Sequence, residues 1–443
     1  MKRSRLGAHT AVRRFRTYFA VCVPAVPFLI SPGLQGQQAI TLDQAVDLAL
    51  ARSPAYAQAA ASVDNARETR RTAIGAFLPD LGLNSGASVR PGSVFDPTTE
   101  ARLATTNRSF SGGLSLGMDL FTGGRNRSEL GRAGVEVQAA DAPLAGQHFQ
   151  VILQTKQFFF GALEQADLFE VAQARVDRAQ DSLELVRRQV TAGVATASDS
   201  LRARLELANA QQSALQTEAQ RRAAQTALGR QIGVSGAVVA VSPAELEPTP
   251  LALSDTGIYR TAELNSPDVR AAELAAGADQ ASATSARAAY LPAVRIYSGY
   301  NWSNSDWGFG GGEGAWNGLS LSLSYSVFNG FARESSVARA DNQLRVSRLQ
   351  ENDTRLRARE DEDAALFAIR TSQLAVEIAE EAVVVAEEDL RVVLQRLEVG
   401  VSTVFEVVTS QVALMEAEAS RVTTRYDYLI ARAQLEAILG EEL

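Results

Sequence analysis

The sequence contains one short turn motif twice, and this duplication limits the folds open to the chain. Gly-Val-Ala-Thr-Ala-Ser-Asp begins at Gly193 and Gly-Val-Ser-Thr-Val-Phe-Glu begins at Gly400, 207 positions later (400 − 193). Three further pairs of landmarks keep the same order: Phe121 with Phe328 at the same offset, and Pro54 with Pro267 and Pro79 with Pro292 at an offset of 213 (267 − 54). Ordered self-similarity of this kind indicates a structural repeat. We therefore expect one repeat over residues 37–233 and another over 257–443, with a Pro- and Val-rich linker at 234–256 that adds structure around the middle of the helices.

Each repeat predicts a short helix, two strands, a very long helix, a turn and a returning helix. The expected helices are residues 42–76, 127–191 and 197–232 in the first repeat, and residues 258–289, 331–399 and 404–439 in the second. A helix of 69 residues is roughly 100 Å long at about 1.5 Å per residue. Two helices of about 35 residues placed end to end match that length. The pattern predicts antiparallel coiled-coil rods, each with a strand pair at one end and a hairpin turn at the other.

The strand segments alternate apolar with small polar side chains, and we expect them at about residues 81–120 and 293–328. The apolar side of the second strand in each repeat consists of Leu114, Leu116, Met118 and Leu120, and of Leu319, Leu321, Leu323, Tyr325 and Val327. A period of two with one apolar face indicates a strand that is wet on one side. Each run is about 10 residues long, the length of a tilted strand across a bilayer. The apolar faces are therefore predicted to meet lipid.

The N-terminus, residues 1–36, has the pattern of a signal peptide: a basic start followed by a short apolar stretch. A buried N-terminal helix is the alternative. Removal of this segment takes away six of the 43 basic residues and none of the 51 acidic ones, so the net charge moves from −8 to −14. Such an acidic chain argues against nucleic acid as a partner. The single cysteine, Cys22, is lost with the segment, which excludes disulfides and thiol chemistry from the remainder.

The residue inventory argues against an enzyme and predicts neither a cofactor nor a metal site. His148 is the one histidine after residue 36, and no metalloprotease, phosphate-loop or nucleophile-elbow motif occurs. The glycine-rich run at 308–314 lacks the Lys-Ser/Thr of a phosphate loop, and we interpret it as an extracellular loop with flanking tryptophans. The acidic run at 360–363 fits a solvated helix face, and a cation-selective lining is the alternative.

Four strands cannot close a barrel, and an open sheet edge is not tolerated in lipid. Three copies of the chain would supply 12 strands, an even number that closes. The sequence thus predicts a mainly α protein with a β-barrel portion, in which a homotrimer forms a 12-stranded barrel and a helical tunnel. A pore-free periplasmic or surface coiled-coil protein is the alternative, but such a protein would need no amphipathic strands.

This duplicated plan resembles the outer membrane efflux protein family of TolC-like channels. The resemblance rests on the ordered set of features over about residues 40–440: the Phe-Leu-Pro and Tyr-Leu-Pro exits into strands, the Phe-x-Gly re-entries and the paired Gly-Val turns. It implies a passive duct in the outer membrane with a long periplasmic extension. It also implies docking on a periplasmic adaptor and on an inner-membrane efflux pump or secretion ATPase. The exported substrate is not predicted.

The resemblance also assigns roles to residues of the two turns. Adaptor docking is implied for Gly193, Val194, Thr196, Gly400, Val401 and Thr403, and the pore constriction for Asp199, Glu406 and Thr409. Thr409 stands where a second acid is common in the family. An alternative stays open for the two acids, because both lie in the first turn of a helix. There, acids favour the helix dipole and a preceding threonine can act as the N-cap.

The long helix of the first repeat contains a proline that the second repeat lacks. Pro143 corresponds to Gln350, and three glycines lie nearby. Because proline removes one backbone hydrogen bond, a kink or a local loop is expected near this position.

Overall fold

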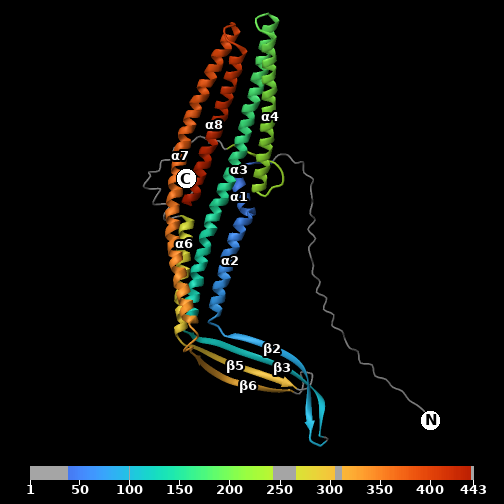
Figure 1. Ribbon diagram of the computed structural model, residues 1–443, viewed down its shortest axis with the longest axis vertical. Coiled ribbons are helices and arrows are strands. Elements are labelled where there is room, and N and C mark those ends of the chain that lie inside the picture. The colour runs from blue at the N-terminus through green and yellow to red at the C-terminus, as the bar shows by residue number, and fades with distance from the viewer. Residues whose placement is uncertain (1–37, 99, 243–265, 305–311, 441–443) are drawn as a thin grey trace, which may run out of the picture. The chain divides into compact units, whose positions relative to one another are not determined.

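The computed structural model describes residues 38–98, 100–242, 266–304 and 312–440. The expected signal peptide, Trp307, the first part of the glycine-rich run and most of the linker lie outside these residues. In Figure 1, long helices run alongside one another and four strands form a sheet. The elements are β1 (Gln38–Ile40), α1 (Leu42–Arg52), α2 (Pro54–Gly75), β2 (Asp80–Asp96), β3 (Ala101–Thr122), α3 (Arg125–Thr191), α4 (Ala197–Gln231), β4 (Val238–Ala240), α6 (Pro267–Arg287), the 3₁₀ turn η1 (Ala288–Tyr290), β5 (Ala293–Asn304), β6 (Glu313–Ser324), α7 (Ala332–Glu398) and α8 (Val404–Leu439).

The helices follow the repeat that the sequence predicts. α3 and α7 each contain 67 residues, and α4 and α8 return along them after the turns. α3 contacts α2, α4, α6 and α8, so it joins elements of both repeats. Apolar clusters lie along these contacts. One of them packs the helices together near the two turns, where α3 meets α4 and α7 meets α8. We call this cluster the tip core, and its buried members are Leu183, Val186, Ala203, Val383, Leu390, Val393, Leu397, Val404, Val407 and Leu414.

The first helix of the first repeat is broken, contrary to the expected single helix over residues 42–76. Ser53 ends α1 and begins α2 in an extended conformation, with φ −69° and ψ 119°. The following proline explains the break, because its ring disfavours helical geometry in the preceding residue. The Ser53 hydroxyl then caps α2 by accepting a 3.3 Å hydrogen bond from the Tyr56 amide. The matching pair Ser266-Pro267 begins α6, and residues 258–265 lie outside the described range.

The local loop considered at Pro143 is absent, because α3 is helical throughout. Packing explains this continuity. The adjacent Ala142 is buried, and a Cβ added at Gly146 would lie 3.3 Å from the ring of Pro267 at the start of α6. A proline inside a helix costs about 3 kcal/mol, and burial along a helix of this length offsets such a cost.

The four-stranded sheet has the order β2-β3-β5-β6, with every neighbouring pair antiparallel. β5 and β6 contain 12 residues each, but β2 contains 17 and β3 contains 22, more than the expected length of about 10. β6 ends at Ser324, so Tyr325 and Val327 lie beyond the strand in which they were expected. Its partner β5 begins at Ala293, directly after Pro292, and proline has no amide hydrogen to extend the pairing.

A second small sheet lies beside the helices. β1 and β4 pair in parallel, which brings the start of the first repeat to the described part of the linker. Ile40 and Val238 are buried in a cluster with Val151, Phe159 and Tyr426 from α3 and α8. This packing ties both chain segments to the middle portion of α3.

Candidate functional site

The turn between α3 and α4, which we call the first tip, is a tight glycine-dependent reversal. Gly193 adopts φ +76°, a left-handed conformation that side chains other than glycine resist. Its amide donates to the Val190 carbonyl at 3.1 Å, and the Val194 amide donates to the Gln189 carbonyl at 2.9 Å. These bonds satisfy the last carbonyls of α3, as in a Schellman-type helix end. The Val194 side chain is left 68% exposed.

The turn between α7 and α8, the second tip, has the same construction. Gly400 also adopts φ +76°, and its amide donates to the Leu397 carbonyl at 3.0 Å. The Val401 amide donates to the Arg396 carbonyl at 2.8 Å, and the Val401 side chain is 66% exposed. The duplicated sequence therefore encodes one backbone shape twice.

The two tips touch each other within one chain. The Gln189 side-chain amide donates to the Leu397 carbonyl at 3.1 Å. A Cβ built on Gly400 would lie 4.0 Å from a Val194 methyl group. The tip core beneath them contains residues of α3, α4, α7 and α8. The sequence analysis missed Gln189, although its place just before the turn marks it as a candidate.

The acid after the first tip caps the returning helix. Thr196 is the N-cap of α4, and its hydroxyl accepts a 3.3 Å hydrogen bond from the Asp199 amide. The Asp199 carboxylate accepts in return from the Thr196 hydroxyl at 2.6 Å and from its backbone amide at 3.0 Å. These hydrogen bonds hold the pKa of Asp199 below its ordinary value. The capping expected for these two residues is confirmed.

The acid after the second tip has different partners. Thr403 is the N-cap of α8 and accepts a 3.3 Å hydrogen bond from the Glu406 amide. The Glu406 carboxylate instead accepts from the Ser402 hydroxyl, and the Glu406 side chain is exposed. Thr409 lies one turn further along, also exposed, and its hydroxyl donates to the Phe405 carbonyl at 2.9 Å. The constriction role of these acids stays a prediction.

We expect Asp199→Ala to loosen the first turn of α4 in a pH-dependent manner. An acid in the first helical turn contributes about 0.3–1 kcal/mol, so amide protection of α4 near Ser200 should fall roughly twofold to fivefold at neutral pH. Since folding lowers the pKa, the stabilisation is present above the unfolded value of about 3.9 and is lost as pH falls through the folded value. Hydrogen exchange at neutral and acidic pH measures this. Equal protection in variant and parent at neutral pH would contradict it.

The sheet separates its side chains into an apolar and a polar face. Register places Leu116 of β3 beside Ser298 of β5, which lies opposite Leu319 of β6, so all three share one face. The predicted lipid-facing residues that lie in strands are all exposed in the single chain: Leu114, Leu116, Leu319, Leu321 and Leu323. Tyr325 is also exposed, but it lies beyond β6. Contact of this face with lipid stays a prediction.

The polar face contains a charge cluster that the sequence analysis missed. Arg295 of β5 pairs with Asp80 of β2 at 2.8 Å and with Asp119 of β3 at 3.4 Å. The three side chains meet across the strand ends that join the helices. Each of the three residues alternates with apolar residues in its strand, so the sequence could have placed all three on the polar face. Which of them pair depends on the strand register, which the sequence does not determine.

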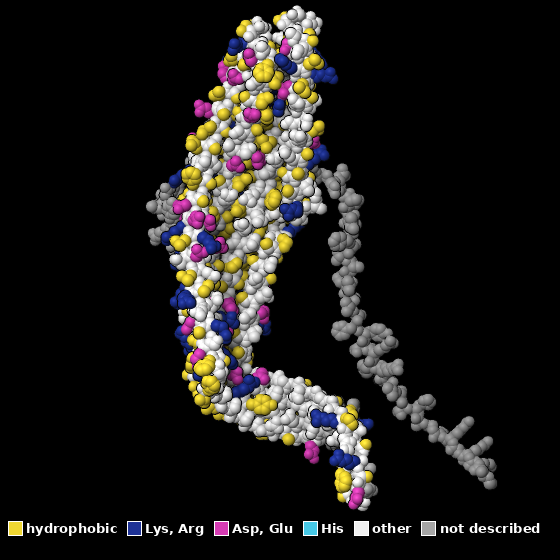
Figure 2. Space-filling view, viewed as in Figure 1, with side chains coloured by type: hydrophobic (Ala, Val, Ile, Leu, Met, Phe, Trp, Pro, Cys, Tyr) yellow, Lys and Arg dark blue, Asp and Glu magenta, His cyan; other side chains and the backbone are white. Residues whose placement is uncertain are grey.

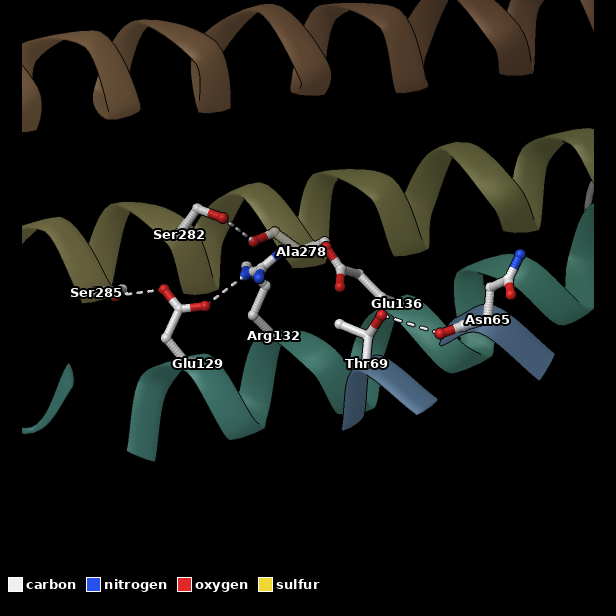
Figure 3. A network of polar contacts seen from close by, with 8 residues as sticks. All are labelled: Asn65, Thr69, Glu129, Arg132, Glu136, Ala278, Ser282 and Ser285. Atoms are coloured by element: carbon white, nitrogen blue, oxygen red, sulfur yellow. Dashed lines mark hydrogen bonds and ion pairs between the residues drawn. The ribbon is translucent and has the colours of Figure 1, made fainter. Parts of the chain in front are cut away.

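Near the start of α3, a polar network joins α3 to α6 (Figure 3). Glu129 accepts 2.9 Å hydrogen bonds from the Ser285 hydroxyl of α6 and from the Arg132 guanidinium. Arg132 also pairs with Glu136 one turn along. Burial raises the pKa of Glu129, but the hydrogen bonds from Ser285 and Arg132 outweigh it, and the pKa lies below its ordinary value. The network fixes the first helix of the second repeat against the long helix of the first.

The described residues lack two kinds of feature. None of the helices in this part of the chain is both long enough and apolar enough to cross a membrane. Within the same residues, no group of three or more His, Cys, Asp or Glu side chains is arranged to hold a metal ion.

Comparisons with known proteins agree with this geometry. Protein CyaE of Bordetella pertussis is 27% identical over 344 residues, covering 74% of this chain and 69% of the relative. The probable efflux pump outer membrane protein TtgC of Pseudomonas putida is 22% identical over 404 residues, covering 90% of this chain and 82% of the relative. The solved structure of the outer membrane protein VceC from Vibrio cholerae superposes with a TM-score of 0.73 at 19% identity, covering 90% of this chain and 96% of that one. The fold is therefore shared with a solved outer membrane protein.

The family model described as "Outer membrane efflux protein" matches residues 45–234 and 258–441. These two segments correspond to the two repeats, and together they include both tips, all four long strands and the long helices. The chain therefore belongs to the outer membrane efflux protein family.

Proposed function

We propose that three copies of this chain form a 12-stranded barrel in the outer membrane, continued by a helical periplasmic tunnel. The observation that carries this proposal is the two-faced sheet with open edges. β2 and β6 each pair on one side only among the described residues. Because unpaired strand edges are not tolerated in lipid, they need partners from other copies. The apolar face then meets lipid and the polar face lines the lumen.

Exposed apolar side chains on the helices support the same assembly. α4 presents Leu201, Leu205 and Leu215 at 62–68% exposure, although a soluble helix rarely leaves such a row uncovered. α7 likewise presents Leu374 and Ile378. Neighbouring copies placed around one axis would cover these rows and complete a ring of rods.

The tips are the proposed docking surface for a periplasmic adaptor, with an inner-membrane efflux pump or secretion ATPase behind it. Val194 and Val401 offer exposed apolar contacts on rigid glycine turns. Gly193, Gly400 and the N-caps of the returning helices fix the shape of those turns. The name of TtgC describes an efflux pump component, which favours efflux as the process served.

The assembly is tested by purifying the full chain from outer membranes and recording from planar bilayers. The duct predicts an oligomer that dissociates on heating in detergent, together with discrete conductance steps. A pore-free coiled-coil protein predicts recovery from the soluble periplasmic fraction and no conductance. The second result would refute the proposal.

We expect Glu406→Gln to weaken cation selectivity if the second tip closes the duct. Three exposed Glu406 carboxylates around one axis would attract cations and bind multivalent ones. Their removal should weaken block by a trivalent cation roughly tenfold, which corresponds to about 1.4 kcal/mol. The control is Glu387→Gln, at an exposed position of α7 that precedes Gly400 by 13 residues (400 − 387). This variant should leave the block unchanged. Unaltered block and selectivity in Glu406→Gln would exclude this residue from the constriction.

A further inference from the structure

The β2–β3 hairpin is longer than the sheet it belongs to. β5 pairs with β3 only as far as Asn304, opposite Phe110. Beyond that point, β2 and β3 continue as a two-stranded ribbon from the pair Ser88–Ser109 to the pair Asp96–Ala101. No third strand accompanies this ribbon in the described part of the chain. Figure 1 shows it extending past the ends of β5 and β6.

The two faces of the sheet continue onto the ribbon. The face that holds Leu114 and Leu116 in the sheet holds Val89, Phe95, Arg102 and Arg108 on the ribbon, all exposed. Figure 2 shows basic side chains gathered on this ribbon. On this parity, the two strands contain no acidic residue between Leu81 and Phe95 or between Arg102 and Leu120.

The opposite face of the ribbon mixes polar and apolar residues, since Val94 lies on it opposite Leu103. The Ser88 and Ser109 hydroxyls share a 2.8 Å hydrogen bond across the strands. Arg90 also lies on this face, opposite Asn107. The ribbon therefore carries exposed arginines on both faces, but two of them, Arg102 and Arg108, share the face that continues the apolar side of the sheet.

The position of Arg108 follows from the length of the apolar band. From Leu120 to Phe110 along β3 the chain takes ten steps (120 − 110), or roughly 34 Å at about 3.4 Å per residue. A tilt of about 40° reduces this to roughly 26 Å, which matches the apolar height of about 25 Å in outer-membrane barrels. Phe110 and Trp302 form an edge-to-face pair at this rim, with ring centroids 5.6 Å apart. Arg108 is the next residue on the same face, so the proposed barrel would place it at headgroup level.

We propose that Arg108 and Arg102 bind the phosphate groups of an anionic glycolipid in the outer leaflet. One guanidinium group can donate two parallel hydrogen bonds to the oxygens of a phosphate. The strand positions of this face contain no carboxylate that would repel the phosphate. Arg102 stands six residues beyond Arg108 on the same face, roughly 20 Å along the strand at about 3.4 Å per residue. Two cations at such different heights fit a headgroup that carries phosphates at more than one level, as a phosphorylated lipopolysaccharide does. This inference rests on the proposed barrel.

The test uses the full-length oligomer in neutral detergent, titrated with a short-core lipopolysaccharide that retains its phosphates. Intrinsic fluorescence reports binding, because all three tryptophans of the chain lie between residues 302 and 316. Arg108→Gln should weaken binding about fivefold and the Arg102→Gln, Arg108→Gln double variant about 30-fold, as each basic residue contributes about equally at an anionic surface. Arg90→Gln is the matched control on the opposite face and should bind like the parent.

Three outcomes would overturn the proposal. The double variant could bind like the parent, which would remove the arginines from the interaction. Arg90→Gln could lose as much as Arg108→Gln, which would indicate net charge rather than a face. Inorganic phosphate at millimolar concentration could compete fully, which would assign the arginines to a soluble anion. Conductance in phosphatidylcholine bilayers is measured in parallel. If the parent shows no conductance, the barrel itself is refuted. If conductance is normal and the double variant binds lipid like the parent, only this inference is refuted.

Discussion

Leu321→Arg should prevent the chain from accumulating as an inserted oligomer. Leu321 is the middle member of the β6 row between Leu319 and Leu323, and it is 68% exposed on the apolar face of the sheet. An arginine on the lipid face near the bilayer midplane costs about 2–4 kcal/mol per chain. In a trimer this cost applies three times. The yield of heat-modifiable oligomer in outer membranes and urea unfolding in lipid vesicles both measure the effect.

The neighbouring Ser320→Arg variant is the matched control for the apolar face. Ser320 lies on the opposite, polar face of the same strand, where its hydroxyl donates to the Tyr297 carbonyl at 3.2 Å. An arginine there would face the water-filled lumen of the proposed barrel and should leave insertion close to that of the parent. If both variants insert equally well, the apolar face of β6 does not meet lipid.

The helices were largely predictable because their ends are encoded locally. The sequence predicted α8 at Val404–Leu439, as observed, and it predicted α4 to within one residue. A threonine N-cap begins each of these helices, and a left-handed glycine turn precedes it. Such signals depend on a few adjacent residues and need no tertiary context. The break at Ser53 carried an equally local signal, its following proline, which the apolar periodicity concealed.

The strand lengths and the charge cluster were not predictable for the opposite reason. The ribbon of β2 and β3 contains Pro91 and Gly92, which break the apolar alternation, and its pairing is decided by the partner strand. A proline is tolerated in β2 because it is an edge strand of the single chain. Arg295 meets acids that are 176 and 215 residues away in sequence. Only the register of the assembled sheet brings them together.

Gly400→Pro should abolish export while leaving the oligomer assembled. Proline fixes φ near −65°, whereas Gly400 requires +76°, and it removes the amide that donates to the Leu397 carbonyl at 3.0 Å. The second tip would therefore lose its shape. The nearest strand, β6, ends 76 residues before Gly400 (400 − 324), so the sheet should keep its structure. Export of a pump substrate by cells with the native adaptor and pump measures the loss, and heat-modifiable migration measures assembly.

Two further variants separate a docking defect from a folding defect at this tip. Gly400→Ala keeps the amide donor and strains the turn by only about 1–2 kcal/mol, so it should retain part of the export. Val401→Asp leaves the backbone intact but places a charge on a side chain that is 66% exposed, and it should block export if the tip binds an apolar partner surface. Val401→Thr keeps the size and should export normally. Normal export by Val401→Asp would remove Val401 from the docking surface. Normal export by Gly400→Pro would show that the shape of the second tip is not what the adaptor recognises.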